Sequence, residues 1–126
     1  MALYCKIGKK LIDNRFYLIE DIIVADADFI ATKPSNEKWV ETYDLPQNEN
    51  PRNIRGGIGY YYWESADKFI HRKPYPSWIF NEKTLDYDPP VPRPENVEVI
   101  TDDYVISVVW DESVKNWATL KREMPN

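Results

Sequence analysis

The alternation of hydrophobic and polar residues along the chain predicts β-strands in its first third. Residues 3–7 alternate strictly, with apolar side chains at every second position, and the Gly-Lys-Lys run at 8–10 predicts a turn. Residues 16–25 are rich in Ile, Tyr and Val, and part of this stretch is apolar at successive positions, as in a strand buried on both faces. Residues 39–43 return to an extended pattern. We therefore expect three strands in this part of the chain.

Polar and turn-forming residues separate these strands. Asp26 precedes a short stretch at 27–30, and its carboxylate is well placed to cap a helical turn there. Residues 44–57 contain two prolines and few aliphatic side chains, which predicts a polar loop longer than usual. Loops of this length are often functional or mobile, but an ordinary surface excursion is an equally good interpretation.

The second half of the chain contains a spaced repeat: an aromatic residue, Glu two positions later, and a second aromatic residue seven positions after the first. Polar residues that favour type I turns lie between the aromatic residues. The pattern predicts three β-hairpins, each with an aromatic pair across its strands, and we expect these pairs to pool into one core. The aromatic residues are Tyr62 and Phe69, Phe80 and Tyr87, and Trp110 and Trp117, with Glu64, Glu82 and Glu112 between them.

Proline marks the connections between these hairpins. Six of the ten prolines lie between positions 74 and 94, in the stretches 74–76 and 89–94. Because proline lacks an N–H and fixes φ, neither stretch is expected in a helix or at the centre of a sheet. Residues 89–94, which we call the Pro strap, fit equally well a rigid spacer or a strap laid on a neighbouring subunit.

Composition supports a small folded protein. The chain has 126 residues, with five Trp, nine Tyr and four Phe, and such aromatic content is not typical of disorder. We predict a mainly β, small single domain of antiparallel strands and three short aromatic β-hairpins, with one short helix and Pro-rich connectors. Its expected parts are N-terminal strands and helix at 1–43, a loop at 44–57, the three-hairpin region at 58–120, and a fraying tail at 121–126.

Charge and apolar runs exclude several classes of partner. The net charge of -5 disfavours a nucleic-acid-binding protein. The apolar runs are too short for membrane insertion, and the first residues lack the pattern of a secretory signal. The single Cys cannot form an internal disulfide, so we expect synthesis in a reducing cytoplasm.

Candidate catalytic residues are few. His71 is the single histidine and has no evident partner, Cys5 falls on the apolar side of a strand, and the sequence lacks the common phosphate-binding and nucleophile motifs. The three repeated Glu residues could suggest paired carboxylates for glycoside hydrolysis, but their identical position in each turn indicates a structural role. We expect no catalytic residue, no cofactor and no metal, and therefore a protein that is not an enzyme.

Several of these motifs together resemble a family of small proteins from marine tailed phages, particularly cyanophages. The resemblance covers most of the chain, including residues 22–26, 29–30 and 39–40. It rests mainly on the run 57–60 (Gly-Ile-Gly-Tyr), Tyr62, Phe69, the run 73–78 (Lys-Pro-Tyr-Pro-Ser-Trp), Asn81, Pro89-Pro90-Val91-Pro92 with Pro94, and Trp110-Asp111-Glu112 to Trp117. Two features depart from the family: the loop 44–55 is shorter, and Tyr87 stands where a Trp commonly precedes the strap.

The resemblance implies a phage setting, and we expect a structural or accessory protein of the virion, in capsid or tail, that acts by protein–protein packing. Its partners would be other phage structural proteins or copies of itself, and residues 3–7 could offer an exposed strand edge to a partner's sheet. Two alternatives remain open: a module that binds host glycan through exposed aromatic rings, and an assembly or host-directed factor. The candidate interface residues are Pro74, Tyr75, Pro76, Trp78, Pro89, Pro90, Pro92 and Pro94.

Overall fold

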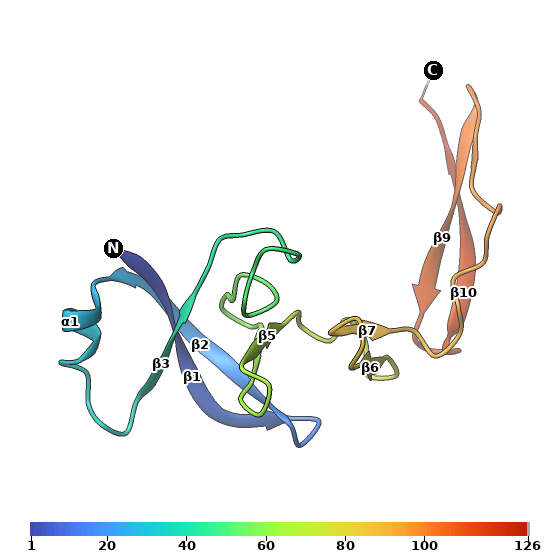
Figure 1. The fold of residues 1–126 in the computed structure, drawn as a ribbon. Helices are drawn as coiled ribbons and strands as arrows, with labels where there is room; N and C mark the ends of the chain where they lie inside the picture. The colour runs from blue at the N-terminus through green and yellow to red at the C-terminus, as the bar shows by residue number, and fades with distance from the viewer. Residues whose placement is uncertain (126) are drawn as a thin grey trace. The chain divides into compact units, whose positions relative to one another are not determined.

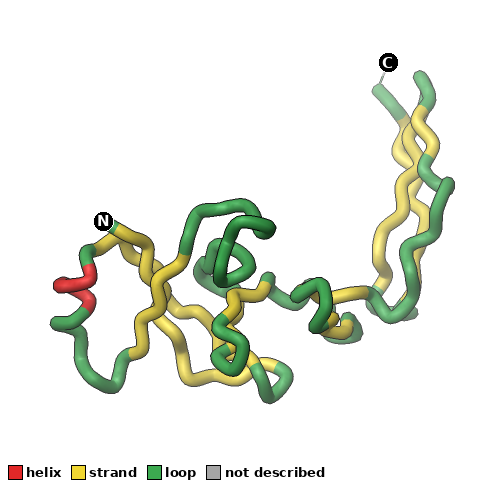
Figure 2. Tube along the Cα trace, in the orientation of Figure 1, coloured by secondary structure: helices red, strands yellow, loops and turns green. Residues whose placement is uncertain are grey.

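The computed structural model describes residues 1–125 and confirms the mainly β class, with antiparallel sheets and one short helix (Figures 1 and 2). The chain divides into two compact units, Met1–Arg72 and Lys73–Asn126. The division falls inside the segment 58–120 that the sequence groups as one region of three hairpins. Each unit is therefore described separately.

The first unit is built on a five-stranded sheet with the strand order β3-β1-β2-β4-β5. Its longest strands form one antiparallel hairpin, and the other three are short (Figure 1). The strands are β1 (Ala2–Ile12), β2 (Phe16–Ala25), β3 (Lys38–Thr42), β4 (Tyr61–Trp63) and β5 (Lys68–Ile70).

The predicted turn at 8–10 is wrong, because β1 continues through these residues. The pairing of β1 with β2 is irregular along this part of the strand. The register shifts between Lys6 and Ile7 and again between Ile7 and Leu11. The chain reverses instead at Asp13 and Asn14, with φ angles of 53° and 57°. Asp and Asn tolerate this left-handed conformation better than most residues, which explains the position of the turn.

The expectation of an exposed strand edge at residues 3–7 is also wrong. These residues pair with β2 on one side and with β3 on the other, so that Cys5 lies opposite both Ile22 and Val40. Strand β3 has to return from a distant part of the chain to cover this edge. The local alternation of residues 3–7 contains no sign of that second partner.

The predicted helical turn forms as α1 (Ala27–Ile30), but the predicted capping interaction does not. The Asp26 carboxylate makes no capping hydrogen bond, and the backbone carbonyl of Asp26 instead accepts from the N–H groups of Phe29 and Ile30. The carboxylate lies 3.6 Å from the N-terminal ammonium of Met1.

The long loop at 44–57 is folded against the sheet. The Thr42 Oγ1 atom of β3 accepts a hydrogen bond from the Gly56 N–H at 2.7 Å. Arg52 donates to the Glu41 carbonyl in β3, and its own carbonyl accepts from the Phe69 N–H in β5. The loop thus bonds to both edge strands of the sheet and adds Ile54 to the core. The core residues are Cys5, Ile7, Ile19, Val40, Ile54, Tyr62 and Phe69.

The second unit consists of a small hairpin and a three-stranded sheet with the order β10-β9-β8. The tail prediction fails in part, because β10 extends to Glu123, which pairs with Tyr104. Strand β8 is an element that the sequence pattern does not single out. The strands are β6 (Ile79–Asn81), β7 (Asp86–Asp88), β8 (Val99–Ile100), β9 (Tyr104–Asp111) and β10 (Asn116–Glu123).

Candidate functional site

The three predicted aromatic hairpins are confirmed as β4–β5, β6–β7 and β9–β10. In each hairpin the two aromatic residues of the repeat are direct cross-strand partners. Aromatic pairs of this kind contribute roughly 0.5–1.5 kcal/mol beyond their burial. Their ring centroids are 5.2 Å apart in Tyr62–Phe69, 5.5 Å in Phe80–Tyr87 and 5.3 Å in Trp110–Trp117.

The repeat has its fixed spacing because the three hairpins share one loop geometry. Each loop has four residues, and the fourth adopts a left-handed backbone conformation: φ is 55° at Asp67, 60° at Leu85 and 53° at Lys115. This residue turns the chain back into the second strand. The aromatic residue two positions later is thereby placed opposite the first one.

The three Glu residues occupy the first loop position but differ in their side-chain contacts. Glu64 binds the Lys38 ammonium at 2.7 Å in the first unit. Glu112 accepts hydrogen bonds from the Ser77 hydroxyl at 2.6 Å, the Ser77 N–H at 3.1 Å and the Trp110 indole at 2.9 Å. These bonds lower the pKa of Glu112 below its usual value of 4.5.

The three aromatic pairs are divided between the two units. Tyr62 and Phe69 belong to the core of the first unit, where Phe69 is completely buried. The pairs Phe80–Tyr87 and Trp110–Trp117 belong to the second unit, in which Tyr87 and Trp110 are buried. The sequence predicted that all three pairs pool into one core, but the compact units divide them, with one pair in the first unit and two in the second.

Candidate interface residues from the motif 73–78 join the third aromatic pair in the second unit. Trp78 packs edge-on against Trp110 at 5.8 Å and 88°, and lies 6.3 Å from Trp117 at 59°. The exposed Tyr75 ring lies 5.7 Å from Trp78 and 6.4 Å from Trp110. We call these four residues the tryptophan cluster. Pro74 and Pro76, on either side of Tyr75, are exposed.

The Pro strap contacts its own unit. The Trp117 indole N–H donates to the Val91 carbonyl at 2.8 Å, which holds the strap against β10. Pro89 is partly buried, whereas Pro90, Pro92 and Pro94 are exposed. From the sequence, the strap could be a rigid spacer or could lie on a neighbouring subunit. The structure shows a contact of the strap within its own chain and does not decide between these two interpretations.

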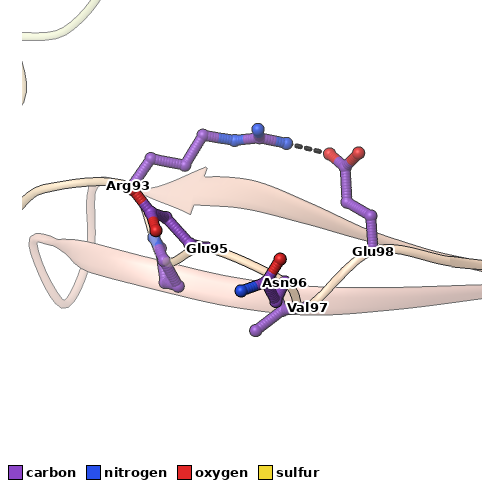
Figure 3. Close-up of a pocket in the computed structure, with 6 residues that line it drawn as sticks. Arg93, Glu95, Asn96, Val97 and Glu98 are labelled. Carbon is purple, nitrogen blue, oxygen red and sulfur yellow. Dashed lines mark hydrogen bonds and ion pairs between the residues drawn. The ribbon is translucent and has the colours of Figure 1, made fainter.

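A hollow of about 450 Å³ lies at the C-terminal end of the strap (Figure 3). A single loop at 93–98 forms it, and an ion pair between Arg93 and Glu98 spans its ends. Asn96 within the loop has a φ of 60°. Because one short exposed loop forms the whole hollow, its shape depends on that loop alone.

The feature that sequence reasoning missed is a sheet face in the second unit that carries several exposed apolar side chains among polar ones. The β8–β9–β10 register places Ile100 opposite Val105, and Val109 opposite Ala118. Leu120 shares this face, which we call the open face. Ile100, Val109 and Leu120 are 82%, 40% and 38% exposed. The alternation of residues 104–111 and 116–123 could have revealed it, since both runs place apolar side chains on two faces.

Cys5 and His71, the other residues considered for catalysis, each pack against neighbouring side chains. Cys5 is buried in the first core, and burial raises the pKa of its thiol to about 11. The His71 ring lies 5.3 Å from the Tyr60 ring. Within residues 1–125, no group of three His, Cys, Asp or Glu side chains is arranged to hold a metal ion.

The helix in the described part of the chain is too short to cross a membrane. Comparisons with known proteins add no relative: the chain matches no protein-family model, no curated protein and no solved structure.

Proposed function

We propose that the protein is a non-enzymatic structural protein that acts by packing against other proteins, as an accessory subunit of a tailed-phage particle. The observation that carries the proposal is the open face of the second unit. Apolar side chains that line up on one face of a sheet and remain exposed are typical of a protein–protein contact. Ile100 alone is 82% exposed on this face.

The carboxylates with shifted pKa values support a structural role, since each is engaged by neighbouring side chains. Glu112 accepts its hydrogen bonds from Ser77 and Trp110. Burial raises the pKa of Asp67, but hydrogen bonds from Tyr62 and Arg52 outweigh burial and leave it lowered. In both cases the carboxylate belongs to a hairpin loop and joins that loop by hydrogen bonds to a residue outside the hairpin, Arg52 for Asp67 and Ser77 for Glu112.

The phage setting rests on the family resemblance described above. The matching motifs include the tryptophan cluster and the Pro strap, both of which lie in the second unit. A capsid or tail location fits a small unit with an open apolar face. Other phage structural proteins, or copies of the chain itself, are the partners that such a face suits.

The ring geometry of the tryptophan cluster favours packing over glycan binding. A sugar-stacking platform needs exposed rings in a common plane. Here Trp78 meets Trp110 at 88°, Trp110 meets Trp117 at 78°, and Trp110 is buried. These angles are typical of edge-to-face contacts inside a protein.

Mass spectrometry of purified phage particles, compared with the infected-cell lysate, tests the proposal. We expect the protein in the particles at a fixed copy number: hundreds of copies for a capsid subunit, or a few to tens for a tail subunit. Abundance in the lysate together with absence from particles would overturn the structural role and favour an assembly or host-directed factor.

A further inference from the structure

The edge of β10 that faces away from β9 is the longest sheet edge without a partner strand in residues 1–125. The other edge strands are shorter: β3 has five residues, β5, β6 and β7 have three each, and β8 has two. Strand β3 is also partly covered, because Arg52 and Gly56 of the long loop bond to it. Strand β10 has eight residues. The Pro strap bonds to the Trp117 side chain near its start, and residues 119–123 are exposed.

Strand β10 is also regular. Its pairing with β9 runs through eight consecutive residue pairs, from Asn116–Asp111 to Glu123–Tyr104, at constant register. It contains no Pro, which natural proteins often place on an edge to block pairing. Residues 119–123 are all exposed. A long, regular, exposed edge is suited to the addition of another strand.

The sequence of β10 is complementary to itself in one antiparallel register. In a two-fold symmetric pair of strands, one residue faces its own copy, and opposed side chains point to the same face of the sheet. Registers centred on Lys121 or Arg122 place like charges opposite each other, which is destabilising. A register centred on Thr119 pairs residues with no like charges opposed: Thr119–Thr119, Ala118–Leu120, Trp117–Lys121, Asn116–Arg122 and Lys115–Glu123.

This register also extends the open face. Ala118 and Leu120 lie on that face, so the pairing sets Ala118 of each copy against Leu120 of the other. On the opposite face, Thr119 meets Thr119, a favourable cross-strand pair, and Lys115 meets Glu123 with opposite charge. A register centred on Leu120 would avoid like charges but place Glu123 opposite Trp117.

We propose that two copies of the chain associate through antiparallel β10–β10 pairing centred on Thr119, which joins two three-stranded sheets into one of six strands. The inference deepens the proposed packing function, since it names a second copy as the partner of this edge. It concerns the isolated protein, whereas the particle experiment concerns its location. The two can therefore fail separately.

Cysteine cross-linking of the full chain tests the register. In an antiparallel pair, directly opposed Cα atoms are about 4.5–5.5 Å apart, which lies within the range for a disulfide. We expect Thr119→Cys to form a covalent dimer on mild oxidation. The matched control is Lys121→Cys, on the same face of the same strand, whose two copies would lie too far apart to bridge. The native Cys5 is buried, so we expect it to form no intermolecular disulfide.

Light scattering of the wild-type protein over a wide concentration range gives the second measurement. We expect a dimer, and we expect Thr119→Glu and Thr119→Lys each to raise its dissociation constant by about tenfold through like-charge repulsion. An equimolar mixture of the two variants should restore association. A monomer at all concentrations, equal cross-linking of both cysteine variants, or a dimer insensitive to both charges would overturn the proposal.

Discussion

Lys115 shows how a single backbone conformation sets the shape of a hairpin. It closes the β9–β10 loop with a φ of 53°, in the left-handed region that is costly for residues with a Cβ. We expect Lys115→Gly to stabilise the second unit by about 0.5–1 kcal/mol, because relief of this strain exceeds the added entropy of the unfolded chain. Urea denaturation measures the effect.

The neighbouring Val114 supplies the control for this substitution. It lies in the same loop, is 65% exposed, and does not have a positive φ. Val114→Gly should therefore destabilise the unit, because only the cost in unfolded-state entropy remains. Equal effects of the two glycine substitutions would contradict the role assigned to the left-handed position.

Glu112 makes the stability of the second unit depend on pH. Its folded-state pKa is lowered by hydrogen bonds from Ser77 and Trp110, so below pH 4.5 the unfolded chain takes up a proton more readily than the folded one. The stabilisation is complete above that pH and is lost as the pH falls through the folded-state pKa. We expect Glu112→Gln to destabilise the protein at neutral pH, with a difference from wild type that shrinks in acid.

Urea midpoints at a series of pH values test this prediction. Glu95→Gln removes the same charge from an exposed position of the same unit and serves as the control. If the two variants showed the same pH dependence, general charge effects would account for it. The hydrogen bonds between Glu112 and Ser77 would then contribute nothing to the pH dependence of stability.

At the scale of elements, the loop 44–57 depends on a few buried hydrogen bonds. Thr42 is 3% exposed and accepts from the Gly56 N–H. Thr42→Val keeps the shape of the side chain but leaves a buried N–H without its acceptor, which costs about 1–3 kcal/mol. We expect this loss in thermal or urea denaturation. Thr42→Ser retains the hydroxyl and should retain most of the stability, and equal losses would point to packing instead.

The elements that could be predicted from the sequence are those fixed by local interactions. Tyr62 and Phe69 are seven residues apart and pair through a four-residue loop, so their spacing alone reveals the hairpin. The pairing of Cys5 with Val40 depends on a strand far along the chain, and local alternation cannot report it. Alternation within β9 and β10 indicates part of the open face, but the addition of Ile100 to it requires the register between β8 and β9.

The candidate site was predictable to the same extent. The repeat identified Trp110 and Trp117 as partners, and the motif 73–78 contributed Trp78 to the same cluster. The contacts of Glu112 with Ser77 could not be foreseen, because 35 positions separate these residues. Sequence spacing thus located the aromatic residues, whereas their environment follows from tertiary packing.

At the scale of the whole molecule, the division into two compact units predicts two separable unfolding events. Phe69 is completely buried in the first unit, and Trp110 is 8% exposed in the second. Replacement of a buried Phe or Trp by Ala typically costs about 3–5 kcal/mol. We expect Trp110→Ala to destabilise residues 73–126 and to leave the stability of residues 1–72 unchanged, and Phe69→Ala to do the reverse.

Amide hydrogen exchange resolved by residue distinguishes the two events, because protection reports the local free energy of opening. In Trp110→Ala, the amides of β9 and β10 should lose protection while those of β1 and β2 keep it. In Phe69→Ala the pattern should be inverted. A uniform loss of protection in either variant would mean that the chain unfolds as one cooperative body, and that its two compact units do not act as independent units of stability.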